Sequence, residues 1–265
     1  MGNEFEKQKQ IVDKMNIIDD TFFHKMVENP EVCEEMIQTF LEDDSIRVIQ
    51  NMPQRYLRNT GAKSVVLDVL CKDNRNRWMN IEVQKADNDN HQKRVRYNAS
   101  NIDTYMTEKG IKYDEMPDVY VIYIGKFDVF GKQQTVYHIE RIIHETGDTV
   151  ENGCHEIYLN TKHEDGSKIS ELLQYMVNTR GENSKFPRIS RHVRYYKEEQ
   201  EGVRTMCELL EKYGDERVEE ADRKTAREFL RNGVDYEVVK KSMPDLNREI
   251  LESIYQEVMQ EKKQS

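Results

Sequence analysis

Two acidic residues in neighbouring apolar segments are the part of this sequence best suited to chemistry. Asp68 lies in the segment SVVLDVLC, Glu82 lies in RWMNIEVQ, and the polar stretch 72–76 joins the two segments. Apolar and polar residues alternate in both segments, which predicts two half-buried strands, and the Asp- and Asn-containing stretch predicts the turn of a hairpin. Folding this hairpin about Arg75 places Asp68 opposite Glu82 on one face, with Cβ atoms roughly 5 Å apart.

Carboxylates at that separation repel each other, so the pair predicts a compensating positive charge. A divalent cation is the natural candidate, because hard oxygen ligands suit Mg²⁺ and Mn²⁺. The exposed face of a strand is normally polar, however. The residues alone are therefore also consistent with two surface carboxylates on a solvated hairpin.

The order of segments along the chain resembles the PD-(D/E)XK nuclease family transposases, relatives of the Rpn recombination-promoting nucleases. Asp68 and the run Glu82-Val83-Gln84 correspond to the Asp and the Glu-x-Lys of the family hairpin, with glutamine in the lysine position. DDTFFHKMVENPEVCEEMIQTFL is similar to the opening helix of that family, and HQKRVRYNASNIDTYM is similar to the helix after the glutamate strand. HEIYLNTK, LLQYMVN and VRYYKEEQEGVRTMCELLE resemble later segments, so the resemblance covers residues 16 to 215 or so.

The resemblance implies a metal site in this hairpin. Asp68, Glu82 and the backbone carbonyl of Val83 would hold Mg²⁺ or Mn²⁺, and Gln84 would contact the attacking water. A glutamine can orient water but, unlike the lysine of most relatives, cannot stabilise hydroxide by its charge. Lys85 is expected on the other face of the strand, so the missing charge must come from elsewhere.

Four further positions are expected to support the site. Lys93 or Arg94 on the following helix could supply the missing positive charge. Arg94 and Tyr97 match an Arg…Tyr pattern of the family and share a helix face, so we expect Arg94 to contact phosphate and Tyr97 to line the cleft. A solvated arginine above a half-buried tyrosine is the alternative. Asp20 is either a carboxylate that supports the metal site or a helix N-cap.

The remaining elements predict an α/β fold. The chain is expected to run from a helical stretch at 20–42, split at Pro30, through a strand at 46–52 and the hairpin to a helix at 91–108, and then to strands at 118–127, 134–142 and 155–160. Residues 1–15 are expected to be loose. A crossover helix permits a parallel strand pair, which predicts a mixed central β-sheet flanked by helices. This agrees with the restriction-endonuclease-like core that the resemblance implies.

The chain is expected to divide into a nuclease-like core at 16–165 and a helical C-terminal extension at 166–265. The extension is read as a packing or dimerisation element, which makes a homodimer through the C-terminal helices the expected assembly. A helix-turn-helix DNA reader at 222–257 is the alternative, which the acidic balance of this segment disfavours.

Charge is distributed unevenly along the chain. The net charge is −10, yet residues 44–112 contain 13 Lys/Arg and 8 Asp/Glu and so carry +5, which leaves −15 for the remainder. Local charge governs contact with phosphates, because screening limits its reach to about 8 Å at physiological salt. DNA is therefore an acceptable partner for the segment that contains the carboxylates.

Four scattered cysteines, with no C-x-x-C spacing, are expected to be reduced thiols of a cytoplasmic protein. No apolar run approaches the ~20 residues of a membrane helix, and 1–10 lacks the apolar region of a secretory signal. No membrane association is therefore expected.

The resemblance and the local charge together predict a magnesium-dependent DNA endonuclease, a hydrolase of phosphodiester bonds. It would serve transposase-like recombination or phage defence. RNA cleavage is a variant of this prediction. The alternative is a nuclease-fold protein that binds DNA or a partner without cutting, since Gln84 replaces the lysine and the surface is acidic overall.

Overall fold

The computed structural model describes residues 2–58, 63–107 and 110–264. The chain forms two compact units, the first ending at Arg204 and the second beginning at Thr205. The expected boundary at 165/166 thus lies inside the first unit. Helices α5 (Lys168–Val177) and α6 (Pro187–Glu198) contact α3 (Pro30–Phe40), and α6 also contacts α2 (Asp20–Val27), which explains why they belong with the sheet.

A six-stranded mixed sheet forms the centre of the first unit, with strand order β1-β2-β3-β4-β6-β5. The strands are β1 (Val48–Leu57), β2 (Val65–Asp73), β3 (Trp78–Gln84), β4 (Val119–Gly125), β5 (Val136–Ile139) and β6 (Cys154–Asn160). Each expected strand is present, and the mixed, helix-flanked sheet is consistent with the restriction-endonuclease-like fold that the sequence predicts.

The hairpin register is the predicted one. β2 and β3 pair antiparallel from Lys72↔Trp78 to Val69↔Ile81, which is the register set by a turn about Arg75. β3 and β4 pair parallel through the crossover helix α4 (His91–Met106), also as expected. The position 108 at which that helix was expected to end lies outside the described residues.

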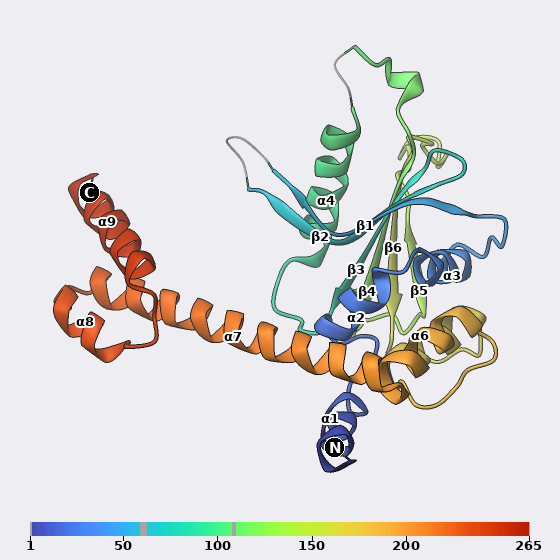
Figure 1. The fold of residues 1–265 in the computed structure, drawn as a ribbon. Helices are drawn as coiled ribbons and strands as arrows, with labels where there is room; N and C mark the ends of the chain where they lie inside the picture. Colours follow the sequence, from blue (N-terminus) through green and yellow to red (C-terminus); the bar gives the residue numbers. More distant parts are fainter. Residues whose placement is uncertain (1, 59–62, 108–109, 265) are drawn as a thin grey trace. The chain divides into compact units, whose positions relative to one another are not determined.

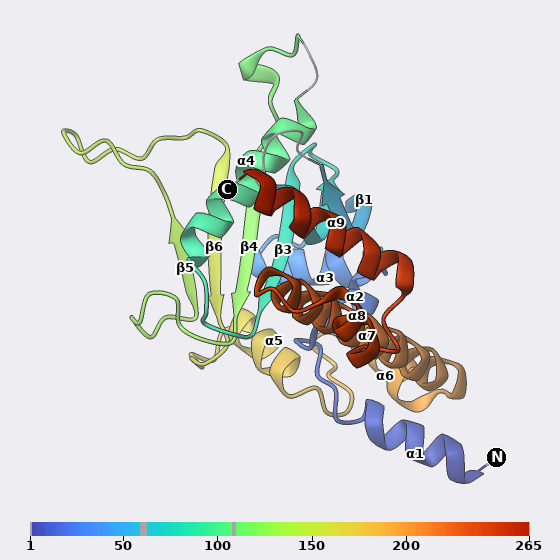
Figure 2. The same cartoon turned by 90° about the vertical axis from the view of Figure 1, so that its left-hand side faces the viewer.

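Helices cover both faces of the sheet. α4 packs on one face, and α2 and α3 pack on the other, as Figures 1 and 2 show from two directions. Because β3 lies between β2 and β4 under both layers, its residues are buried on both faces up to Val83. The half-buried strand predicted from alternation is therefore wrong for β3.

The N-terminal segment differs from expectation. Residues predicted to be loose form α1 (Gly2–Val12), which contacts α6, and Val12 is fully buried. The split at Pro30 is confirmed, since α2 ends at Val27 and α3 begins at Pro30 with Asn29 as its N-cap.

Three helical elements make up the rest of the chain. α7 (Gln200–Arg231) continues from the first unit into the second, which also holds α8 (Tyr236–Ser242) and α9 (Arg248–Gln264). The core of the second unit combines α7, α8 and α9 through seven buried residues: Ala226, Leu230, Val239, Leu246, Leu251, Ile254 and Val258. Among the described residues, no helix has the length and apolar character needed to cross a membrane.

Candidate active site

The two predicted acidic residues meet where three strands stop pairing regularly. The β2–β3 ladder ends at Val69↔Ile81, and the β1–β2 ladder has no pair at Gln54 and Asp68. Side chains replace the missing ladder bonds at this point. The Asp68 amide donates to Glu82 Oε1 (3.1 Å), and the Val83 amide donates to Asp68 Oδ2 (2.9 Å).

Glu82 is a buried carboxyl, with 1% of its surface exposed. Burial and the nearby charge of Asp68 raise the pKa of Glu82 to about 7, although hydrogen bonds and Arg94 act in the opposite direction. Asn80, two residues earlier on β3, donates to Glu82 Oε1 (2.9 Å) and fixes its orientation. Removing a carboxylate from water is costly unless it is paired, so this site must supply positive charge or a proton.

Arg94 supplies part of that charge. From the first turns of α4, its Nη2 donates to Glu82 Oε2 (3.3 Å) and its Nη1 donates to Gln84 Oε1 (3.1 Å). Gln84 donates in turn to the carbonyl of Ala86 (3.0 Å). A single guanidinium therefore links the acidic residue of the predicted motif to the glutamine that stands in the family's lysine position.

Asp68 takes its support from the opposite layer. His24 on α2 lies with Nε2 3.2 Å from Asp68 Oδ1, and its Nδ1 lies 3.0 Å from the amide nitrogen of Gln54. An amide nitrogen can only donate, so His24 Nδ1 accepts and Nε2 carries the proton that it gives to Asp68. Gln54 adopts φ +47°, which is uncommon for a residue with a side chain, and this kink in β1 accompanies the contact.

The backbone of Val83 also faces the site. The Gln84 carbonyl accepts from the Lys126 amide on the β4 side (2.9 Å). Because successive carbonyls of a strand point in opposite directions, the Val83 carbonyl is directed toward β2. Its own amide already points there, to Asp68.

These donors fit a divalent cation. Asp68 and Glu82 supply carboxylates, and Val83 supplies a carbonyl oxygen, beside the end of the β2–β3 ladder. Hard oxygen ligands are what Mg²⁺ prefers while retaining several waters. Within the described residues, no group of three or more His, Cys, Asp or Glu side chains is arranged to hold a metal ion.

A basic groove adjoins Arg94. It has a volume of about 600 Å³ and is bounded by the residues leading into β2 and by the first half of α4. Its lining includes four cationic residues and a single acidic one, Lys63, Lys93, Arg94, Arg96 and Asp89. Tyr97 also lines it, with its hydroxyl donating to the Lys63 carbonyl (2.5 Å). Lys93 and Tyr97 are thus placed in the groove beside the site.

Asp20 was expected either to support the metal site or to cap a helix, and its surroundings in the structure differ from both expectations. It is the first residue of α2, whose N-cap is Asp19, and its side chain lies 3.5 Å from Lys85 Nζ. Lys85 also pairs with Asp19 (3.4 Å). Asp20 therefore forms an ion pair with Lys85, the residue that follows Gln84.

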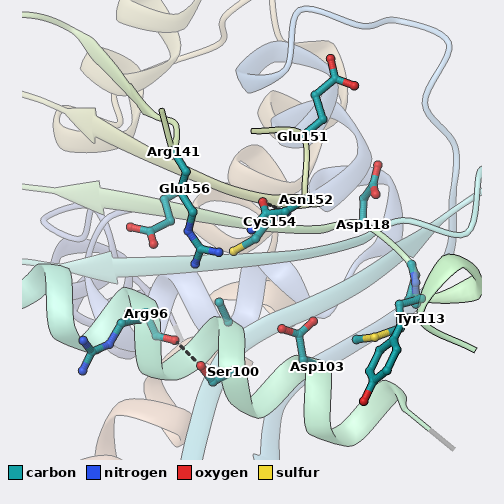
Figure 3. Close-up of a pocket in the computed structure, with 14 residues that line it drawn as sticks. Arg96, Ser100, Asp103, Tyr113, Asp118, Arg141, Glu151, Asn152, Cys154 and Glu156 are labelled. Carbon is teal, nitrogen blue, oxygen red and sulfur yellow. Dashed lines mark hydrogen bonds between the residues drawn. The ribbon is translucent and has the colours of Figure 1, made fainter. Parts of the chain in front are cut away.

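A second cavity shares Arg96 with the lining of the basic groove. It has a volume of about 510 Å³ and lies between α4, the starts of β4 and β6, and the segment that joins β5 to β6 (Figure 3). Asp103 projects into it from α4, and Arg141 extends toward Cys154 and Glu156. None of its fourteen lining residues belongs to the predicted site.

The structure adds residues that sequence reasoning did not assign to the site. His24 and Gln54 reach the site only because β1 is kinked and α2 packs on β2. Neither the kink nor the packing produces a periodic pattern in the sequence. Asn80 could have been found, since it stands two positions before Glu82 on the same face of the strand. Arg94, by contrast, was expected as a source of charge and is placed in contact with Glu82.

Comparison with known proteins gives one match. The family model described as "PD-(D/E)XK nuclease family transposase" matches residues 8–230. Comparison with curated proteins and with solved structures gives no match.

Proposed function

Because the chain belongs to the PD-(D/E)XK nuclease family transposases, we propose that it is a metal-dependent DNA endonuclease. Its reaction is hydrolysis of a phosphodiester bond at the site formed by Asp68, Glu82 and the Val83 carbonyl. The observation that carries the proposal is the buried Glu82 beside Asp68, with a pKa raised to about 7, in a gap that opens next to a basic groove.

Each residue of the site has a distinct role in this proposal. Asp68, Glu82 and the Val83 carbonyl hold Mg²⁺ or Mn²⁺. When bound, the cation lowers the pKa of a coordinated water and neutralises charge that develops on the phosphate. His24 and Asn80 orient the two carboxylates through the hydrogen bonds described above. Removing a ligand-orienting contact of this kind typically lowers metal affinity by about 10- to 100-fold.

Arg94 and Gln84 act on the substrate side. Arg94 contacts a non-bridging phosphate oxygen and supplies the charge that the missing lysine would provide. Gln84 positions the attacking water through Oε1, which retains a second lone pair beyond the Arg94 bond. Lys93 contacts the DNA backbone from the groove, and Tyr97 lines the same path. Asp20 supports the site indirectly by holding Lys85 away from it.

DNA is the proposed substrate. The family description suggests transposition as the setting, and the sequence resemblance implies recombination or phage defence as further settings. The four cysteines are free, and Cys33, Cys71 and Cys207 are buried, which is compatible with a reducing compartment such as the cytoplasm. The second compact unit is proposed to join two copies of the chain. RNA remains an alternative substrate for the same site chemistry.

Plasmid cleavage tests the proposal. Supercoiled plasmid incubated with wild-type protein should be nicked or linearised with Mg²⁺ or Mn²⁺ and left intact with EDTA. Asp68→Asn and Glu82→Gln should abolish cutting, while Asp114→Ala, which removes an exposed carboxylate of the η1 turn (Tyr113–Glu115), should cut like wild type. DNA binding without cutting under every metal condition would favour the non-cleaving alternative.

Calorimetry with Mn²⁺ tests the metal site independently of activity. Wild-type protein and Asp114→Ala should bind Mn²⁺, and Asp68→Ala or Glu82→Ala should lose that binding. Unchanged affinity in both site variants would show that these residues do not hold the ion.

A further inference from the structure

The β1–β2 hairpin carries an exposed apolar pair beside the candidate active site. Tyr56 pairs with Val66 across the hairpin, and 56% and 57% of their surfaces are exposed. Their neighbours Leu57 and Leu67 are buried in the cluster that contains residues of α4. Because strand side chains alternate between faces, Tyr56 and Val66 project from the face opposite α4.

That face is also the one on which Asp68 is supported. Asp68 follows Val66 by two residues, Gln54 precedes Tyr56 by two, and both contact His24 of α2. Residues two apart on a strand are separated by about 7 Å. The exposed pair is therefore about one nucleotide's length along the hairpin from the residues that would hold the scissile phosphate. Of the two, Val66 also belongs to the lining of the basic groove.

Charge on this hairpin suits a polyanion. Between Asp44 and Asp68 the chain contains no Asp or Glu and four cationic residues, Arg47, Arg55, Arg58 and Lys63, in a protein whose net charge is −10. An apolar pair in an acidic segment would fit a basic protein partner, but the segment that carries this aromatic ring is cationic. That combination, an exposed ring with a basic backbone path, is how proteins bind single nucleic acid strands.

We propose that Tyr56, backed by Val66, stacks on an unpaired base of the DNA strand whose phosphate occupies the Asp68–Glu82 site. The inference rests on the proposed function and names its substrate class. In a duplex, both faces of a base are already covered by its neighbours, so the ring finds a partner only at a single strand, a gap, a mismatch or a flipped base. Stacking on a ring tolerates every base, so no target sequence follows from this contact.

Binding measured without cleavage tests this contact. Fluorescence anisotropy in EDTA at fixed salt compares a labelled single strand with the matching duplex for wild-type, Tyr56→Ala, Tyr56→Trp and Tyr113→Ala proteins. Tyr113 is the matched control, because it is 92% exposed and lines the other cavity. Loss of a stacked base should weaken single-strand binding about 5- to 150-fold in Tyr56→Ala, and duplex binding less than twofold. Tyr56→Trp should bind at least as well as wild type.

A second readout reports stacking itself. 2-Aminopurine placed at successive positions of the single strand should be quenched by wild-type protein at one position, and Tyr56→Ala should restore its fluorescence there. Circular dichroism of each variant verifies that the fold is kept.

The outcomes separate this inference from the proposed function. Suppose that wild type cuts plasmid with Mg²⁺, and that Tyr56→Ala binds the single strand as tightly as wild type and the Tyr113→Ala control. The stacking role is then wrong, and the nuclease proposal stands. If wild type neither cuts nor binds DNA, both are wrong. If Tyr56→Ala changes the oligomeric state instead of DNA affinity, a second copy of the chain covers the pair, and the base-stacking role is overturned.

Discussion

Glu82 is a carboxyl whose protonation is coupled to folding. Its pKa is raised from 4.5 to about 7 by burial and by Asp68. Between these values the folded protein keeps a proton that the unfolded chain has released, so the free energy of unfolding falls as pH rises through this window. Below pH 4.5 and above pH 7 both states have the same protonation at this residue. Through this residue, the metal-free protein therefore loses stability in the pH range where the Glu82 carboxyl becomes ionised and able to bind a cation.

Urea unfolding in EDTA at pH 4.5 to 7.5 measures this effect. As pH rises, the free energy of unfolding of wild type should fall relative to that of Glu82→Gln by on the order of 3 kcal/mol. This figure is the pKa difference between 4.5 and about 7 multiplied by about 1.36 kcal/mol per pKa unit. Adding Mn²⁺ should restore wild-type stability near pH 7 but leave Glu82→Gln unchanged. Glu115→Gln, an exposed carboxyl, is the control. Parallel pH profiles for wild type and Glu82→Gln would contradict the raised pKa.

Gln84 is polar in a strand that is buried almost throughout, and it is bound to Arg94. Gln84→Ala should preserve Mn²⁺ affinity and the fold while slowing single-turnover cleavage, because the attacking water loses a positioning contact. Such contacts contribute about 10²–10⁴ in rate, and a neutral amide should fall near 10². Gln84→Lys should retain or raise activity. Cleavage by Gln84→Ala at the wild-type rate would leave Gln84 with only the structural role of holding Arg94.

His24 is expected to matter for the metal rather than for the DNA. His24→Ala removes the hydrogen bond to Asp68 Oδ1 and should weaken Mn²⁺ binding about 10- to 100-fold. His144→Ala, an exposed histidine of the β5–β6 connection, should have no effect. Calorimetry gives both affinities, and equal values for the two variants would exclude the orienting role.

The sequence predicts the positions of the two carboxylates in the site better than the positions of the residues that surround them. Asp68 and Glu82 could be predicted to lie together because alternation and turn symmetry set a hairpin register, and the observed register is the predicted one. The residues that surround these two carboxylates could not be predicted in the same way. Alternation predicts a regular strand, whereas the kink at Gln54 and the break at Asp68 give Asp68 a partner from α2 while Glu82 has one from α4. Contacts between layers depend on packing, which has no period along the chain.

At the scale of elements, α4 and the β1–β2 hairpin form the two walls of the basic groove. α4 is anchored at its first residue, where His91 bonds the Tyr123 hydroxyl of β4 (2.8 Å) and Asp87 (2.9 Å). Tyr123 is the ladder partner of Glu82. This anchor sets the position of Arg94, one turn further along the helix, over the carboxylate.

Salt dependence separates the roles of Lys93 and Arg94. Each phosphate contact that is lost should reduce the slope of log affinity against log salt by about 1. Lys93→Ala should lower affinity and slope but leave single-turnover cleavage unchanged at saturating DNA. Arg94→Ala should lower all three, because Arg94 also pairs with Glu82. Lys112→Ala, an exposed cation ahead of η1, is the control, and unchanged slopes for both test variants would place the DNA path elsewhere.

The elements themselves were largely predictable, with two exceptions that share a cause. The strands and the parallel β3–β4 crossover follow from alternation and from the helix between them. The helical form of residues 2–12 and the burial of β3 on both faces do not, because both depend on partners distant in sequence. For the same reason α5 and α6 belong to the sheet unit, although their helical pattern resembles that of the tail.

At the scale of the whole molecule, the second compact unit has an acidic surface and its own core. From Thr205 on, the sequence contains 15 Asp/Glu and 11 Lys/Arg, a balance of −4 that repels DNA rather than attracting it. Two valines of this unit are largely exposed, Val218 at 62% and Val238 at 53%. Contact with another protein chain would remove this apolar surface from water, and the proposal here is a second copy.

Light scattering coupled to size-exclusion chromatography tests that assembly. The full chain should elute as a dimer at micromolar concentration, and Val218→Glu combined with Val238→Glu should shift it toward the monomer, because charges in an apolar interface would be desolvated without partners. Gln260→Glu, at an exposed position of α9, adds charge away from both valines in the sequence and should leave the dimer intact. The variants should keep Mn²⁺ affinity, since the metal site lies wholly in the first unit. A monomeric wild type, or a dimer that resists both glutamates, would rule out these valines as the contact.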